Sequence, residues 1–179
     1  ERNVYAKKPI NSADDLKGMI IRVNDSPTYV EMAKLMGGNG SVMAQSEVYT
    51  ALQQGALDGQ ENPATVILTN NVAQVNNHLA LTEHAYSTVF LVMSPTTWAS
   101  FDDETKQIFT DVMEECSLSE RELSRSMDAD AVEELEEQGM TVTRPDKQQF
   151  IDKAADLYAQ WEEEYGDIIS EIRALAVTK

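Results

Sequence analysis

The sequence has 179 residues, a formal net charge of −17 at pH 7 and a hydrophobic fraction of 42%. That fraction is enough for a buried core and excludes an intrinsically disordered chain. The acidity disfavours nucleic acid and anionic membranes as partners, because phosphate groups are bound by clustered basic side chains. The charge is uneven: residues 101–179 carry 22 acidic and 8 basic side chains, whereas the first hundred residues carry 9 and 6.

The cysteine content and hydropathy give little information on the compartment. Cys116 is the only cysteine, so no intrachain disulfide can form, as in many extracytoplasmic bacterial proteins. No stretch approaches the roughly 18 apolar residues that a membrane helix requires, so we expect no membrane span. The chain opens on polar residues rather than on a signal peptide, which is also expected of a secreted protein whose signal has been removed.

Short helices alternate with short apolar runs in the first half of the chain. Ser26-Pro27 resembles a helix start and Gly37 the corresponding stop. Such alternation predicts an α/β layer with a largely parallel sheet. The expected helices are residues 12–18, 27–37, 46–55 (capped by Ser46) and 63–71, and the expected strands are residues 19–23, 41–44, 56–62, 78–81 and 85–93.

One long helix is expected in the second half. Its pattern begins at Asp102 or Asp103 and continues without glycine or proline to about Gln138. At about 1.5 Å per residue the helix would be roughly 50 Å long, which exceeds the width of a small domain, so it should span two lobes or bend. A strand at residues 140–143 and a helical tail to about Val177 follow. The long helix has an apolar stripe made of Ile108, Val112, Cys116, Leu123, Met127, Ala131 and Leu135.

Motifs for catalysis, phosphate or metal binding are weak. Cys116 lies in the apolar stripe, which indicates a core residue, and no Gly-x-Ser-x-Gly elbow occurs. The glycine-rich run at residues 37–40 lacks the Lys-Ser/Thr of a P-loop and is interpreted as a turn. His78 and His84 have no further metal ligand at a suitable spacing and are interpreted as half-buried, hydrogen-bonded side chains. A hydrolase remains an alternative, with an acid–base pair drawn from Asp58, Glu61 and Glu83.

Arg22 is the most informative basic residue. It ends an apolar strand run, and ligands of α/β folds bind outside the carboxyl ends of strands. A guanidinium there could hold a carboxylate with two charged hydrogen bonds, worth about 1.5–3 kcal/mol. An internal salt bridge with Asp25 or Glu61 would explain the same residue, and the pattern alone leaves both readings open.

Several runs resemble the solute receptors of TRAP transporters, the DctP/SiaP-like family. The resemblance covers essentially the whole chain. It implies a periplasmic-binding-protein-like α/β fold with two lobes and a long spanning helix, which binds an organic acid and delivers it to a membrane permease. The matching runs are Asp15-Leu16-Lys17-Gly18-Met19-Ile20-Ile21-Arg22-Val23, Ser46-Glu47-Val48-Tyr49-Thr50-Ala51-Leu52-Gln53-Gln54-Gly55, Asp58-Gly59-Gln60-Glu61-Asn62-Pro63, Leu81-Thr82-Glu83-His84 and Gln138-Gly139-Met140-Thr141-Val142.

The resemblance also implies roles for individual residues. Arg22 would form the main salt bridge to the ligand carboxylate, and Asn62 would be a second polar contact. Arg2 occupies the place of a second ligand-facing arginine in the sialic-acid branch. Gln45 stands where that branch has an aromatic residue, which suggests a sugar acid or uronate. Tyr86 is a further candidate because it is close to His84 in the sequence.

Two departures from the family pattern stand out. The residue after Arg22-Val23 is usually proline in the family, and here it is Asn24. Family members are also considerably longer, and the part without a counterpart here is N-terminal. Residues 1–87 and 128–179 would then form the second lobe, and residues 88–127 would belong to the first lobe and the interlobe helix. The apolar run 89–93 would lack its sheet neighbours and invite self-association.

The resemblance therefore implies a binding protein without catalysis and without a cofactor or metal. The expected partners are a small organic acid (a sugar acid, uronate or dicarboxylate) and the TRAP permease subunits. The expected location is the periplasm or, as a lipid-tethered protein, the outer side of the membrane. An effector-binding regulatory domain on the same two-lobed plan is an alternative, and it would require a DNA-reading module upstream.

Overall fold

Six strands form one mixed sheet in the computed structural model, which describes residues 1–176. The sheet order is β3-β2-β4-β1-β5-β6. The pairs β2–β3, β2–β4 and β5–β6 are parallel, whereas β1 is antiparallel to both β4 and β5. The strands are β1 Arg2–Ala6, β2 Ile20–Val23, β3 Asn39–Val42, β4 Gly59–Asn62, β5 His78–Ala85 and β6 Thr141–Thr143.

Strand β1 was not predicted, and it makes the expected largely parallel sheet a mixed one. All five of its residues are buried, although the run begins with the polar residues Arg2 and Asn3. The strand lies inside the sheet between β4 and β5, so both of its edges are hydrogen-bonded. Hydrophobic patterning did not detect it because its first two residues are polar. Arg2 is bound by Glu61 and Asn62, and the Asn3 side chain accepts the Glu83 N–H at 3.1 Å.

The helices of the first half begin and end near the expected residues. They are α1 Pro27–Leu35, α2 Gln45–Gln54 and α3 Ala64–Thr69, with 3-10 turns at Ala13–Leu16 (η1) and Val72–Gln74 (η2). Gly55 ends α2 with a positive φ of 78° that other residues rarely adopt. The predicted cap Ser46 is wrong: Ala44 is the N-cap, and its carbonyl already accepts the Glu47 N–H at 3.0 Å.

The sheet buries a separate apolar cluster on each face. Successive strand residues point to opposite faces, so Val4 of β1 joins one cluster and Tyr5 the other. The first cluster packs under α1 and includes Ile21 and Val23 of β2. The second packs under α2, α3 and the lower end of the long helix α5. Arg22, between Ile21 and Val23 in β2, therefore points to the α2 side.

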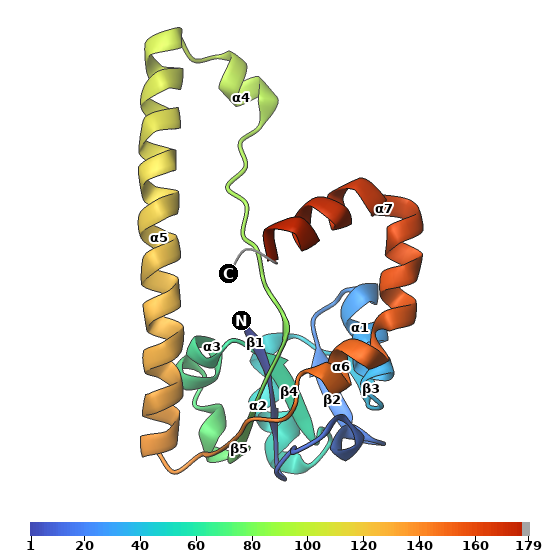
Figure 1. Ribbon diagram of the computed structural model, residues 1–179. Helices are drawn as coiled ribbons and strands as arrows, with labels where there is room; N and C mark the ends of the chain where they lie inside the picture. The colour runs from blue at the N-terminus through green and yellow to red at the C-terminus, as the bar shows by residue number, and fades with distance from the viewer. Residues whose placement is uncertain (177–179) are drawn as a thin grey trace.

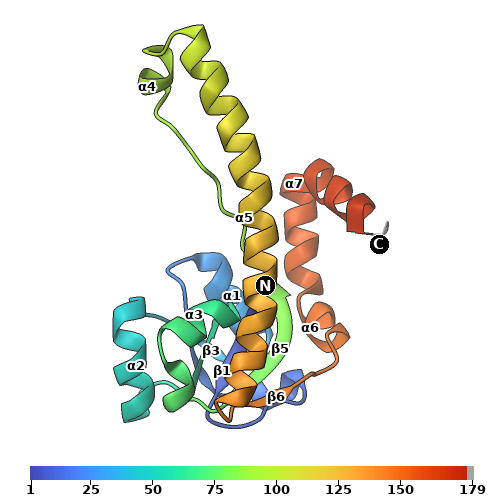
Figure 2. The same ribbon diagram turned by 90° about the vertical axis from the view of Figure 1, so that its left-hand side faces the viewer.

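Helix α5, Asp103–Glu137, is the predicted long helix (Figure 1). The Asp102 carboxylate caps it by accepting the Thr105 N–H at 2.8 Å. Its lower end packs on α3 through buried Ala131 and Leu135, and the remainder projects beyond the sheet (Figure 2). The prediction of a buried Cys116 is wrong, because the stripe continues past the sheet and Cys116 is exposed there.

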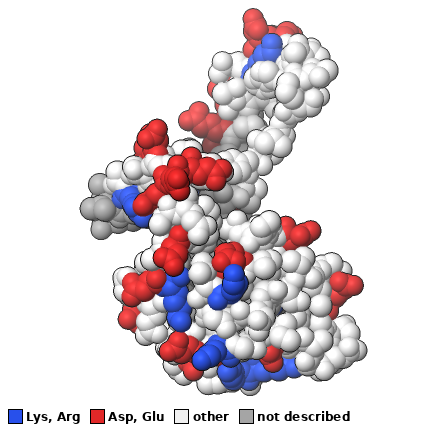
Figure 3. Space-filling view, turned by 90° about the vertical axis from the view of Figure 1, so that its right-hand side faces the viewer, with Lys and Arg blue, Asp and Glu red and all other residues white. Residues whose placement is uncertain are grey.

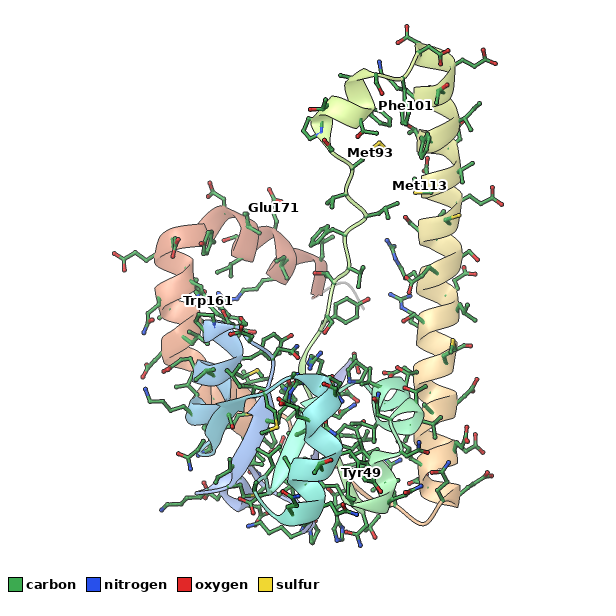
Figure 4. The ribbon with its side chains drawn as sticks, turned by 180° about the vertical axis from the view of Figure 1, so that it is seen from behind. Tyr49, Met93, Phe101, Met113, Trp161 and Glu171 are labelled. Atoms are coloured by element: carbon green, nitrogen blue, oxygen red, sulfur yellow. The ribbon has the colours of Figure 1, made fainter. Side chains whose placement is uncertain are left out.

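Residues 86–94 join the sheet to the tip of the projecting hairpin. The strand predicted at residues 85–93 does not form: β5 ends at Ala85, and the following residues pair with no described strand. Val89 is 92% exposed and its apolar neighbours through Met93 are also exposed, as expected for a run without sheet neighbours. Helix α4, Pro95–Ala99, completes the hairpin, where Met93, Phe101 and Met113 lie on its inner side (Figure 4).

The C-terminal part returns to the sheet and then leaves it. Helix α6, Gln148–Lys153, contributes Phe150 to the first cluster, and α7, Ala155–Ala176, follows with a kink at Tyr165. The predicted helix end near Val177 lies outside the described residues. On the face shown in Figure 3, Asp and Glu are spread from the projecting tip to the lower body, whereas Lys and Arg are densest along the lower edge. Among residues 1–176, no helix is long and apolar enough to cross a membrane.

Candidate functional site

Three of the predicted site residues meet at one edge of the sheet. Arg22 and Asn62 lie at the carboxyl ends of the parallel strands β2 and β4. Arg2 begins β1, which runs antiparallel to β4, so its side chain reaches the same edge. All three residues are buried, each with an exposed fraction of 5%. The sheet topology therefore brings together two arginines and an amide that are up to 60 residues apart in the sequence.

Arg2 is neutralised by Glu61, which is fully buried. Its Nε and Nη2 atoms both donate to the Glu61 carboxylate, and the Nη2–Oε1 distance is 2.8 Å. Nη2 also donates to the Glu61 carbonyl and to Asn62 Oδ1, each at 3.0 Å. The guanidinium lies 5.0 Å from the centre of the Tyr29 ring. Burial by itself would lower the pKa of Arg2, but the bond to Glu61 and its negative charge raise it overall.

Arg22 has no acidic partner. Its Nε donates to the Met43 carbonyl at 2.9 Å, and its Nη1 donates to Asn24 Oδ1 at 3.1 Å. No described carboxylate lies within 4.0 Å of it, so the alternative of a salt bridge with Asp25 or Glu61 is not realised. Burial lowers the pKa of Arg22 and so does the charge of Arg2, while Glu61 opposes both. The site therefore contains one buried cation without a counter-ion.

The amide of Asn62 is held by three neighbours. Its Nδ2 donates to Gln45 Oε1 at 3.2 Å and to Gln60 Oε1 at 2.9 Å, while its Oδ1 accepts from Arg2. Both amide hydrogens of Asn62 are thus used within the protein. Gln45, at the start of α2, keeps its Nε2 group as a donor at the edge of the site. The fully buried Gln60 Nε2 has no hydrogen-bond partner among the described residues.

Tyr86 is not brought into this cluster. Its side chain is 62% exposed, and no hydrogen bond or ion pair within the described chain joins it to the other candidates. The neighbouring Ser87 is closer, because its hydroxyl accepts from Arg2 Nη1 at 3.4 Å. Sequence reasoning missed Ser87, Gln60 and the pairing of Glu61 with Arg2, and only strand β1 could have indicated the last of these.

His84 borders the site through Glu61. Its Nδ1 lies 2.7 Å from Thr82 Oγ1, and its Nε2 lies 3.5 Å from Glu61 Oε2. The neighbouring Glu83 has a positive φ of 45° within an irregular pairing of β5 with β1, which turns this end of the strand. Among residues 1–176, no group of three His, Cys, Asp or Glu residues is arranged to hold a metal.

The three acids considered for hydrolysis do not form a pair. Asp58 lies at the opposite end of β4, where its carboxylate accepts the Ile20 N–H at 2.8 Å. Glu61 is bound to Arg2, and Glu83 forms an ion pair with Lys147. Each carboxylate is thus bound by a different partner: a backbone N–H, an arginine or a lysine. The geometry favours binding of an anion over hydrolysis.

A buried cation framed by amides at the carboxyl ends of parallel strands is suited to binding a small anion, as expected of a ligand-binding protein with an α/β fold. Comparison with known proteins places the chain more narrowly. The sequence model of the DctP family, bacterial extracellular solute-binding protein, family 7, matches residues 1–164. The chain therefore belongs to this family.

Individual relatives agree with this assignment. The sialic acid-binding periplasmic protein SiaP of Vibrio cholerae is 31% identical over 175 residues, which cover 97% of this chain and 54% of SiaP. The 2,3-diketo-L-gulonate-binding periplasmic protein YiaO of Escherichia coli is 30% identical over 148 residues, covering 82% of this chain and 45% of YiaO. The chain thus spans about half the length of these relatives.

Solved structures of TRAP periplasmic solute-binding proteins have the same fold. The protein from Pseudomonas putida F1, with bound D-glucuronate, is 34% identical with a TM-score of 0.86, and the match covers 97% of this chain and 56% of that protein. The protein from Xanthobacter autotrophicus Py2, with bound β-D-galacturonate, is 31% identical with a TM-score of 0.89, covering 97% of this chain and 59% of that protein.

Proposed function

We propose that this chain forms the anchoring side of a TRAP solute-binding site and holds the carboxylate of a small hydroxylated acid on Arg22. The observation that carries the proposal is the buried Arg22 guanidinium, whose hydrogen-bond partners among residues 1–176 are the neutral oxygens of Met43 and Asn24. A buried charge without a partner is costly, and an incoming carboxylate would relieve that cost while forming charge-assisted hydrogen bonds.

The charges of the site favour a monocarboxylic sugar acid over a dicarboxylate. Arg2 and Glu61 cancel each other, so Arg22 is the single uncompensated cation among the arginines of the site. The surrounding groups of Gln45 and Gln60 are neutral amides, which suit hydroxyl groups better than a second carboxylate. Relatives crystallised with D-glucuronate, β-D-galacturonate and D-erythronate support this substrate class.

In this proposal the cleft has a second wall outside the compact body. Residues 1–87 and 128–179 form one lobe, and residues 88–127 belong to the other lobe and the interlobe helix. The exposed apolar run 89–93 and the exposed upper stripe of α5 support this division, because both need a covering surface. The relatives are about twice as long, which would supply that surface. Delivery to TRAP permease subunits, in the periplasm or from a lipid anchor, completes the proposed role.

Calorimetry and thermal unfolding of the full-length gene product would test the function. We expect D-glucuronate, D-galacturonate or D-erythronate to bind and raise the melting temperature, and succinate and D-glucose to bind more weakly. Arg22→Ala should weaken acid binding by at least about 10- to 150-fold, the equivalent of one charged hydrogen bond at about 1.5–3 kcal/mol. The control Arg144→Ala removes an exposed arginine that lies 3.9 Å from Glu136 and should leave binding unchanged. Binding of no acid, or equal binding by Arg22→Ala, would contradict the proposal.

A further inference from the structure

We infer that Asn24 is a positioning residue that sets the anion selectivity of Arg22; this inference rests on the proposed function. Asn24 directly follows β2 and is half-buried. Its side-chain oxygen accepts from Arg22 Nη1 at 3.1 Å, and its carbonyl accepts the Ser26 N–H at 2.8 Å, so the residue is fixed between β2 and the cap of α1.

Two neutral acceptors fix the plane of the Arg22 guanidinium from different elements. The Met43 carbonyl precedes α2 and binds Nε, while Asn24 Oδ1 follows β2 and binds Nη1. A guanidinium has five N–H groups, so these two bonds leave three, all on Nη1 and Nη2. A carboxylate that binds two parallel N–H groups can therefore still be accommodated, and it meets a guanidinium whose orientation is already fixed.

The neutrality of Asn24 is the essential property. An amide oxygen orients the guanidinium without cancelling its charge. A carboxylate at the same position would form an ion pair with Arg22, as Glu61 does with Arg2, and would compete with the ligand. The two arginines of the site thus differ because one has an acid as its neighbour and the other an amide.

Asn24→Asp tests this point with a nearly isosteric change. The measurement is the ratio of the affinity for D-glucuronate to the affinity for the neutral D-glucuronamide, determined by calorimetry on the full-length gene product. We expect Asn24→Asp to lower this ratio by about 10- to 100-fold, chiefly through weaker glucuronate binding. Asn24→Leu, which removes the acceptor without adding charge, should lower the ratio by about 3- to 10-fold.

Asn39→Asp is the matched control, because it adds the same charge at the start of β3, next to Ile20 and away from the site edge. It should preserve the ratio, and thermal unfolding should show that each variant is folded. A ratio in Asn24→Asp equal to that of the unchanged protein overturns the inference, even where Arg22→Ala abolishes binding and the proposed function stands. If the unchanged protein binds no acid, the proposed function and the inference fall together. If thermal unfolding shows that Asn24→Asp is not folded, the same ratio measured in Asn24→Leu decides the question.

Discussion

Removing the charge of Glu61 is the most demanding test of the site's electrostatics. Glu61→Gln keeps the size of the side chain but leaves Arg2 buried without a counter-ion, since the two side chains are 0% and 6% exposed. Removing one partner of such a buried pair costs about 3–5 kcal/mol, far more than breaking a surface pair. In a chain of this size the melting temperature falls by about 2–4 °C for each kcal/mol of stability lost, so Glu61→Gln should lower it by about 6–20 °C.

Urea denaturation should measure this loss, with two comparisons. Glu136→Gln breaks the exposed pair with Arg144, at 3.9 Å, and should cost less than about 1 kcal/mol. The double variant Arg2→Met/Glu61→Gln should be less destabilised than the sum of its single changes, because neither charge is then left unpaired. A loss below 1 kcal/mol in Glu61→Gln, or strict additivity in the double variant, would refute the view that Glu61 neutralises Arg2.

Two further predictions concern the fold that carries the site. In urea denaturation, Gly59→Ala should lower the free energy of unfolding by about 2–3 kcal/mol or more, because the added Cβ would lie 2.3 Å from the Tyr5 carbonyl oxygen. The control Gly166→Ala adds a Cβ with no atom within 4 Å and should be neutral or stabilising. The Asp15 carboxylate accepts the Asn11 and Ser12 N–H groups, which lowers its pKa, so its stabilisation is present above its ordinary pKa and is lost as the pH falls through the lowered value. Asp15→Asn should reduce the fall in the free energy of unfolding between about pH 5 and pH 2, and an unchanged pH profile would contradict this role of the Asp15 carboxylate.

The elements that follow a local rule could be predicted from the sequence. Helix α5 has an acidic cap, no glycine or proline for 35 residues and a glycine directly after its C-cap residue, and it forms nearly as expected. Elements that depend on distant partners could not. Strand β1 has a polar start and is a strand because β4 and β5 flank it. Residues 86–94 have a suitable apolar pattern but no described strand beside them, so the pattern alone did not make a strand.

The same distinction applies to the candidate site. The position of Arg22 at the carboxyl end of a strand could be predicted from the sequence, because chain order and the topology of parallel strands determine it. The hydrogen-bond and ion-pair partners of Arg22 and Arg2 could not be predicted from the sequence, since they depend on which acidic side chain lies next to which guanidinium in the fold. The sequence left Glu61 as a salt-bridge partner of Arg22 or as one acid of a hydrolase, whereas the antiparallel register Asn3–Asn62 brings it to Arg2.

The pairing of Arg2 with Glu61 reduces the repulsion between the two arginines of the site in the absence of a ligand. Two free guanidinium groups at one edge would repel each other, and the pKa of Arg22 is lowered first by burial and then, to a smaller extent, by the charge of Arg2. Glu61 removes the charge of Arg2 while Arg2 still holds Asn62 through Nη2, so the second arginine can act as a structural support. The remaining charge is concentrated on Arg22, whose neighbours are neutral. If Arg22 binds a carboxylate as proposed, this buried cation on a fixed frame would need little rearrangement, and such preorganisation favours both affinity and selectivity.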